Sequence, residues 1–161
     1  MLTQEYLKSI LSYDPETGLF LWKEKKQGRK KNKIAGHQRI DGYVELEINY
    51  KRFLAHRLAF YYIYGIFPKE DIDHVNGIKN DNRFLNLRTA NRSENMQNVK
   101  NHRKDNKSGF LGVSFNKQYG KYVAQLVLNK KHVHISFHDN PENAHEAYIE
   151  AKRKLHPFNQ I

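Results

Sequence analysis

The absence of cysteine constrains most strongly how this chain can fold. None of its 161 residues can form a disulfide or a thiolate ligand for zinc, so no structural zinc is expected. Hydrophobic residues make up 39% of the chain, which indicates small cores rather than one large core. A chain of this length holds one ordinary domain or two very small ones. Such units must be stabilised by packing or by a metal bound through oxygen atoms.

The charge balance predicts a polyanionic partner. The formal net charge is +11, which favours a nucleic acid first and an acidic membrane surface second. The alternative is a solvated basic surface without a partner. The longest largely apolar stretch, Leu58 to Phe67, is too short to span a bilayer, and the N-terminus lacks the pattern of a signal peptide. We therefore expect a soluble cytoplasmic protein that does not contact membranes.

The first part of the chain predicts several short elements. They are a helix over 3–11, a turn at 14–18, a strand at 19–22, a hairpin over 43–54 and a helix over 55–64. Residues 23–39 carry eight basic side chains and one acid. Such a run is usually a solvated loop, although it could also lie along a DNA backbone.

Residues 71–98 predict a strand, a loop, a second strand and a helix. The strands are expected at 71–74 and 85–89, and Asn91 with Glu94 predicts a capping box at the start of the helix. This order would bring three side chains together: Asp73 and His74 from the first strand, and Asn95 from the first turns of the helix.

The residue types in this unit suit phosphodiester hydrolysis with one divalent metal. Asp73 and Asn95 offer hard oxygen ligands for Mg²⁺ or Mn²⁺. His74 can remove a proton from water at neutral pH, and Asn86 could orient its ring by hydrogen bonding. Nearby arginines could hold phosphates by forked hydrogen bonds; they are Arg57, Arg83, Arg88 and Arg92.

Each of these residues also has an ordinary structural interpretation. Asp73 could be a turn acid, His74 a core histidine, and Asn86 and Asn95 capping residues. The combination, at these spacings and in so basic a chain, favours the catalytic interpretation.

Residues 53–98 resemble the HNH endonucleases of phages and mobile introns, which include homing endonucleases. The resemblance is carried by Ala55-His56-Arg57-Leu58-Ala59, Gly65, Pro68, Ile72-Asp73-His74-Val75-Asn76-Gly77, Asp81-Asn82-Arg83, Asn86-Leu87-Arg88 and Glu94-Asn95. Residues 1–52 resemble the N-terminal part of the same family through Tyr13-Asp14-Pro15-Glu16-Thr17-Gly18 and Asp41-Gly42-Tyr43.

This resemblance implies a ββα-metal nuclease core at about 70–98 within a domain spanning 1–98. It implies Asp73 and Asn95 as metal ligands, His74 as general base and Asn86 as the residue that orients the His74 ring. Asn95 stands where many members have a second histidine, so the chain is similar to the H-N-N variants. His56 is expected near the site, either packed there or in contact with phosphate.

Residues 99–108 predict a basic linker, and residues 109–161 a second domain. Alternating segments at 111–115, 122–128 and 132–137 predict a three-stranded meander, followed by a helix that Asn140 caps and Pro141 begins. The expected fold class is α+β: a helix and β-hairpin, the ββα core, then a small antiparallel sheet packed on one helix.

This second domain resembles the plant-type apetala/ethylene-response-factor DNA-binding domain. The matching residues are Ser108-Gly109-Phe110-Leu111-Gly112-Val113, Tyr122-Val123-Ala124 and the helix from Ala144 through Leu155. The resemblance implies that the sheet enters the major groove of DNA. The candidate DNA contacts are Lys117, Lys121, Gln125, Lys130, Lys131 and His134, with Lys104 in the linker. Lysines and amides in place of guanine-reading arginines favour phosphate contacts.

We therefore expect a metal-dependent DNA endonuclease acting on double-stranded DNA, as a monomer, in the cytoplasm of a phage-infected host cell. It would nick DNA to leave a 5′-phosphate and a 3′-hydroxyl. The alternatives are a catalytically silent DNA-binding regulator and a nuclease directed at RNA.

Overall fold

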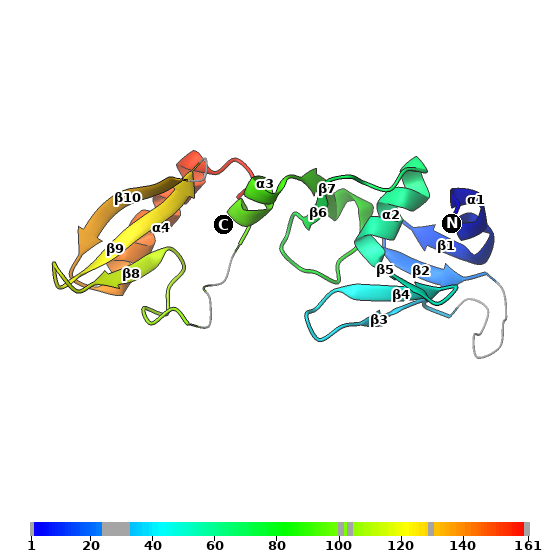
Figure 1. Ribbon diagram of the computed structural model, residues 1–161, viewed down its shortest axis with the longest axis horizontal. Helices are drawn as coiled ribbons and strands as arrows, with labels where there is room; N and C mark the ends of the chain where they lie inside the picture. The colour runs from blue at the N-terminus through cyan, green and yellow to red at the C-terminus, as the bar shows by residue number, and fades with distance from the viewer. Residues whose placement is uncertain (1, 24–32, 100–101, 103–104, 129–130, 160–161) are drawn as a thin grey trace. The chain divides into compact units, whose positions relative to one another are not determined.

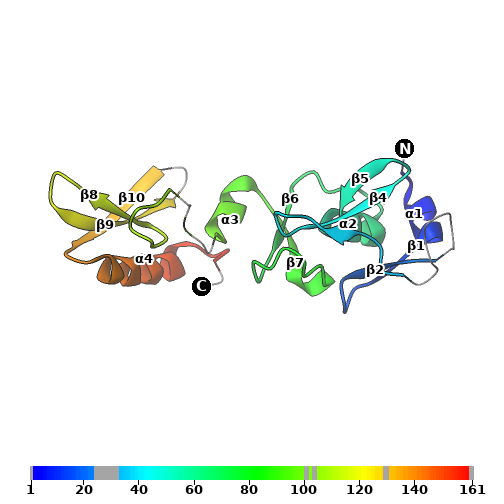
Figure 2. The same ribbon diagram turned by 90° about the horizontal axis from the view of Figure 1, so that it is seen from below.

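The chain forms two compact units, Met1–Ala90 and Asn91–Ile161. The computed structural model describes residues 2–23, 33–99, 102, 105–128 and 131–159, and Figures 1 and 2 show the elements of each unit. The predicted boundary lies at residue 98, whereas the compact units divide before the helix that follows Asn91. No helix in the described part is long and apolar enough to cross a membrane.

The first unit begins with a helix that runs directly into a β-hairpin. Helix α1 (Gln4–Ile10) is capped by the Thr3 hydroxyl, which accepts a hydrogen bond from the Tyr6 backbone N–H at 3.2 Å. Strands β1 (Leu11–Asp14) and β2 (Leu19–Trp22) pair antiparallel. The sequence predicts β2 and the turn before it but not β1, because β1 follows the helix without a turn residue between them.

A second small sheet has the strand order β3-β4-β5. It is built from β3 (His37–Gln38), β4 (Val44–Ile48) and β5 (Lys51–Leu54). The predicted hairpin is confirmed, and its two turn residues, Asn49 and Tyr50, have φ values of 50° and 61°, as a tight primed turn requires. Strand β3 falls in the predicted basic loop at 23–39, of which residues 24–32 lie outside the described residues.

One core joins these elements to the strand pair that carries the site. Helix α2 (Ala55–Tyr64) ends at Gly65, whose φ of 74° suits glycine. Side chains from both sheets and both helices pack in this core together with Ile72 and Leu87 of the site strands. The largest fully buried side chains of this core include Leu7, Leu11, Phe20, Leu46 and Leu58.

The predicted order of strand, loop, strand and helix is confirmed in residues 71–97. It comprises β6 (Asp71–His74), the short 3₁₀ helix η1 (Phe84–Asn86), β7 (Leu87–Ala90) and α3 (Arg92–Gln97). Strands β6 and β7 pair antiparallel. The predicted capping box is also present: Asn91 accepts from the Glu94 N–H at 3.0 Å, and Glu94 accepts from the Asn91 N–H at 2.7 Å.

The second unit is a three-stranded sheet packed on one helix, as predicted. Strands β8 (Val113–Asn116), β9 (Lys121–Leu128) and β10 (Lys131–His138) lie in the order β10-β9-β8. Helix α4 (Pro141–Leu155) covers one face of this sheet (Figures 1 and 2). The whole chain is therefore a mixed structure of helices and small antiparallel sheets, compatible with the expected α+β class.

Two contacts hold the end of α3 within the second unit. The Lys152 ammonium, whose side chain is buried, donates to the Val99 carbonyl at 2.6 Å. The Phe158 N–H donates to the Gln97 side chain at 3.4 Å. These contacts explain why the compact units divide before α3. Of the predicted linker at 99–108, residues 100, 101, 103 and 104 lie outside the described residues.

Candidate active site

Strands β6 and β7 place an acid and a histidine side by side in a buried position. Asp73 and His74 are 7% and 3% exposed. Asp73 lies opposite Arg88 in the strand register, and both the Nε and the Nη2 of Arg88 donate to Oδ2 of Asp73, at 3.0 and 2.8 Å. Arg88, predicted to bind phosphate, therefore holds the predicted metal ligand in place.

The donor set of this segment fits a hard divalent cation. Asp73 supplies a carboxylate, and Asn95, partly buried on α3, supplies a carboxamide oxygen. Asn95 belongs to the second unit, so its convergence with Asp73 stays a prediction. In the described part of the chain, no three His, Asp or Glu side chains form a group that could hold a metal.

The His74 ring packs against two other rings. The His56 ring meets it edge to face with centroids 5.0 Å apart, and the Tyr43 ring lies 5.9 Å from it. Tyr43 and His56 also contact each other at 5.2 Å, and the Lys79 ammonium lies 4.8 Å from the centre of the Tyr43 ring. His56 therefore lies beside the predicted base, buried, and its Nδ1 has no hydrogen-bond partner among the described residues.

Burial favours the neutral form of both histidines. It lowers the pKa of His74, an effect that the hydrogen bond to Asn82 and the charge of Asp73 partly oppose. Burial also lowers the pKa of His56 to about 3, with a further contribution from His74. A neutral imidazole at position 74 is the state that can accept a proton from water.

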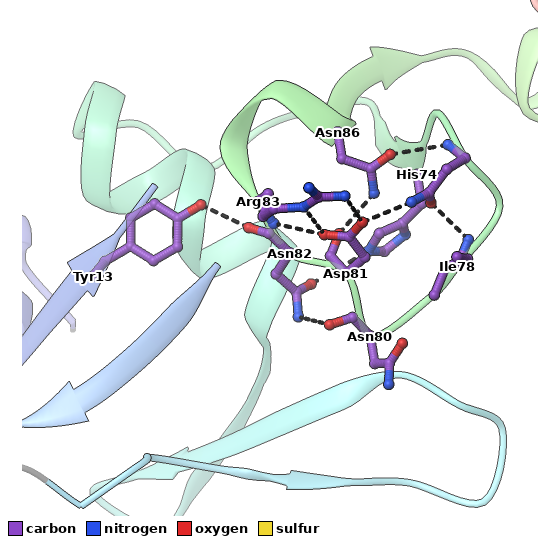
Figure 3. Close-up of polar contacts among 9 residues, drawn as sticks. Tyr13, His74, Ile78, Asn80, Asp81, Asn82, Arg83 and Asn86 are labelled. Atoms are coloured by element: carbon purple, nitrogen blue, oxygen red, sulfur yellow. Dashed lines mark hydrogen bonds and ion pairs between the residues drawn. The ribbon is translucent and has the colours of Figure 1, made fainter. Parts of the chain in front are cut away.

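The loop between the site strands is closed by Asn86. Its side-chain oxygen accepts from the Asn76 N–H at 2.9 Å, and its side-chain nitrogen donates to the Asp81 carbonyl at 2.8 Å (Figure 3). The carboxamide that the structure places on the His74 ring is instead that of Asn82, whose Oδ1 lies 3.3 Å from Nε2 of His74. The sequence marks Asp81-Asn82-Arg83 as a motif, but spacing alone does not show which amide reaches the ring.

Two more predicted phosphate-binding arginines have internal partners. Arg83 donates to both carboxylate oxygens of Asp81, at 2.8 and 2.6 Å (Figure 3), and this contact helps to lower the pKa of Asp81 to about 2. Arg57, on α2, donates to the carbonyls of Glu70 and Pro68 at 3.0 and 2.6 Å. Arg57 thus holds the chain just before β6. Arg92 lies exposed in the first turn of α3.

In the second unit, the predicted DNA contacts divide between the two faces of the sheet. The register pairs Gln125 with His134, and strand alternation puts Lys121 on that same face, away from α4. Lys131 instead pairs with Leu128, which packs toward the core under α4. Lys117 is exposed in the turn after β8, while Lys104 and Lys130 lie outside the described residues.

Sequence reasoning missed the aromatic side chains on the open face of this sheet. Phe137 is 41% exposed and pairs with Val123, next to the Gln125–His134 pair. Its ring contacts those of His134 and Tyr119, with centroids 4.5 and 5.1 Å apart. The alternation of β10 could have indicated Phe137, but an irregularity in the β10 register between His134 and Ser136 obscures the pattern.

Comparison with protein families gives a match that covers the site strands. Residues 53–97, from the end of β5 through α3, match the family model for HNH endonucleases. This match supports an HNH nuclease. The matched segment contains Asp73, His74, Asn86 and Asn95, and the HNH match implies a ββα-metal arrangement for them. No curated protein and no solved structure matches the chain.

Proposed function

We propose that this protein is a metal-dependent DNA endonuclease of the HNH type that nicks duplex DNA. The observation that carries the proposal is a buried His74 beside a buried Asp73, within the segment that matches HNH endonucleases. A divalent metal, Mg²⁺ or Mn²⁺, would be held by Asp73 and Asn95 and would neutralise charge on the phosphate and the departing oxygen.

In this mechanism His74 takes one proton from a water molecule. The water oxygen attacks phosphorus and forms a new P–O bond, while the P–O3′ bond breaks. The 3′-oxygen leaves with the bonding electrons and takes up a proton from solvent. The products carry a 5′-phosphate and a 3′-hydroxyl. General-base help of this kind contributes about 10²–10⁴-fold to the rate. One site per chain acting as a monomer would cut one strand.

The second unit would hold the substrate through the open face of its sheet. Gln125, His134 and Lys121 share this face, which could reach base edges and phosphates in the major groove. The net charge of +11 supports binding to a polyanion.

The test is conversion of supercoiled plasmid to the open-circle form with Mg²⁺, with Mn²⁺ and with chelator. We expect metal-dependent nicking by the wild type and a loss of at least about 10²-fold in His74→Ala, while DNA binding persists. Binding without cleavage under any metal would favour the silent regulator. Preferential cleavage of structured RNA at matched salt would favour the RNA nuclease.

A further inference from the structure

Asn82 places a buried polar side chain against the proposed base, and the proposed mechanism gives it no role. It is 3% exposed and lies eight residues after His74, at the far end of the loop that Asn86 closes. Its Oδ1 lies 3.3 Å from Nε2 of His74, and both side chains are buried at this contact (Figure 3).

The orientation of the Asn82 carboxamide follows from its other contacts. Its Nδ2 donates to the backbone carbonyl of Asn80 at 3.2 Å, so the end of the amide that faces His74 is the oxygen. An amide oxygen can only accept a hydrogen bond, so Nε2 of His74 must donate. In a neutral imidazole only one nitrogen carries hydrogen. Nδ1 is therefore the nitrogen with the lone pair.

The β1–β2 hairpin holds Asn82 in place. The Tyr13 hydroxyl donates to the Asn82 carbonyl at 2.7 Å in a buried contact (Figure 3). Burial raises the pKa of Tyr13, so this hydroxyl stays protonated and keeps donating. The Phe84 N–H donates to the Pro15 carbonyl at 2.9 Å, and a Cβ on Gly18 would lie 2.4 Å from the Arg83 nitrogen. The hairpin thus contacts Asn82 and both residues that follow it.

The aromatic contacts of His74 hold the ring itself. His56 meets it edge to face, and Tyr43 contacts both histidines. A ring packed in this way has little freedom to turn its other nitrogen toward Asn82.

We propose that Asn82 is a positioning residue that holds His74 in the Nε2–H tautomer and so assigns Nδ1 as the atom that takes the proton from water. Asn86 acts differently, by closing the loop that carries Asn82 to the ring. This inference rests on the proposed function only for the role of Nδ1 in hydrolysis. The tautomer and its dependence on Asn82 can be measured without DNA or metal.

The direct test is a long-range ¹H–¹⁵N spectrum of the histidine rings in the full-length protein. We expect His74 to show a protonated Nε2 and a lone-pair Nδ1 in the wild type. Asn82→Ala should give a mixture of tautomers, whereas Asn82→Asp, which also offers an oxygen acceptor, should keep the wild-type tautomer. A wild-type His74 protonated on Nδ1 would overturn the proposal without any variant, and so would an unchanged tautomer in Asn82→Ala.

Cleavage kinetics give a second, separate readout. Orienting partners of this kind contribute about 10–100-fold, so Asn82→Ala should lower kcat by that factor with KM for DNA unchanged, and Asn82→Asp should recover part of the loss. Asn80→Ala is the matched control, because it removes an exposed amide from the same loop and keeps the carbonyl that Asn82 uses. If kcat in Asn82→Ala equals that of the control, the positioning role is wrong. If the tautomer depends on Asn82 but no variant and no wild type cleaves, the tautomer assignment stands and the proposed function fails.

Discussion

His56 illustrates how a single buried residue links the site to stability. Its ring is 4% exposed and packs against His74, and Nδ1 lacks a hydrogen-bond partner among the described residues. Burial disfavours the charged imidazole and, with smaller contributions from the charges of His74 and Arg57, lowers the pKa of His56 to about 3. The contact of His56 with phosphate stays a prediction, whereas the structure shows its ring packed against that of His74.

This burial predicts a stability that depends on pH. The unfolded chain binds a proton on His56 below about pH 6.5, but the folded chain does so only near pH 3. The stabilising effect is complete above pH 6.5 and is lost as pH falls toward 3, by up to about 1.4 kcal/mol per pH unit. Urea unfolding at pH 7 and pH 5 should show a smaller difference in His56→Phe than in the wild type. Equal differences would contradict the buried neutral state.

Three arginines that were predicted to bind phosphate contact groups of the protein itself. Arg88 is bonded to Asp73, Arg83 to Asp81, and Arg57 to two backbone carbonyls. Each of these contacts stabilises the position of a site segment. A buried acid such as Asp73 needs a partner of opposite charge, and the residue directly across the strand pair supplies it.

At the scale of elements, the turn between β1 and β2 supports the loop that joins β6 to β7. A Cβ at Gly18 would lie 2.4 Å from backbone atoms of both Asn82 and Arg83, and φ at Gly18 is +73°. Only glycine combines this φ with this close approach. The hairpin and the loop therefore fit together only when residue 18 has no side chain.

We expect Gly18→Ala to reduce both stability and cleavage. The left-handed backbone costs about 1–2 kcal/mol, and displacement of the 82–83 backbone about 1–3 kcal/mol more. Gly42→Ala is the control, since φ there is +92° but the nearest atom would lie at an ordinary 3.5 Å. Urea unfolding should therefore show a larger loss in free energy of unfolding for Gly18→Ala than for Gly42→Ala. Equal losses would mean that the turn does not support the loop.

At the scale of the whole molecule, the excess of positive charge predicts binding that weakens with salt. Neutralising each phosphate releases condensed counterions, so the logarithm of the binding constant falls linearly with the logarithm of salt concentration. If the open sheet face contacts DNA, removing one of its lysines should change that slope.

Lys121→Gln, on the open face of the sheet, should lower the magnitude of the salt slope by about 1, as expected for one lost phosphate contact. Lys154→Gln makes the same charge change on α4, where Lys154 pairs with Glu150 in the same helix, and should leave the slope unchanged. Titrations of a labelled duplex between about 50 and 200 mM salt would measure both. An equal change in the two variants would show that net charge, rather than the sheet face, determines binding.

Much of the architecture can be predicted because it depends on neighbours in the chain. Alternation in β4 and β9, the capping box at Asn91 and the glycine at position 65 each encode a local conformation. The pair Asp73-His74 at the end of a strand likewise follows from adjacency. These features indicate the order of elements in the HNH-like segment and the sheet-and-helix form of the second unit.

The tertiary structure decided which side chains meet. Asn82 rather than Asn86 reaches His74, Arg88 contacts Asp73, and Tyr43 and His56 enclose the ring. These contacts depend on how the 75–86 loop closes and how the hairpin, α2 and β6 pack in one core, and no local pattern encodes either. The amino-acid sequence by itself thus determined the helices, the strands and the chemical groups that they carry. Packing between distant segments determined which partner each group contacts, because register and loop closure set the hydrogen-bond geometry of a buried site.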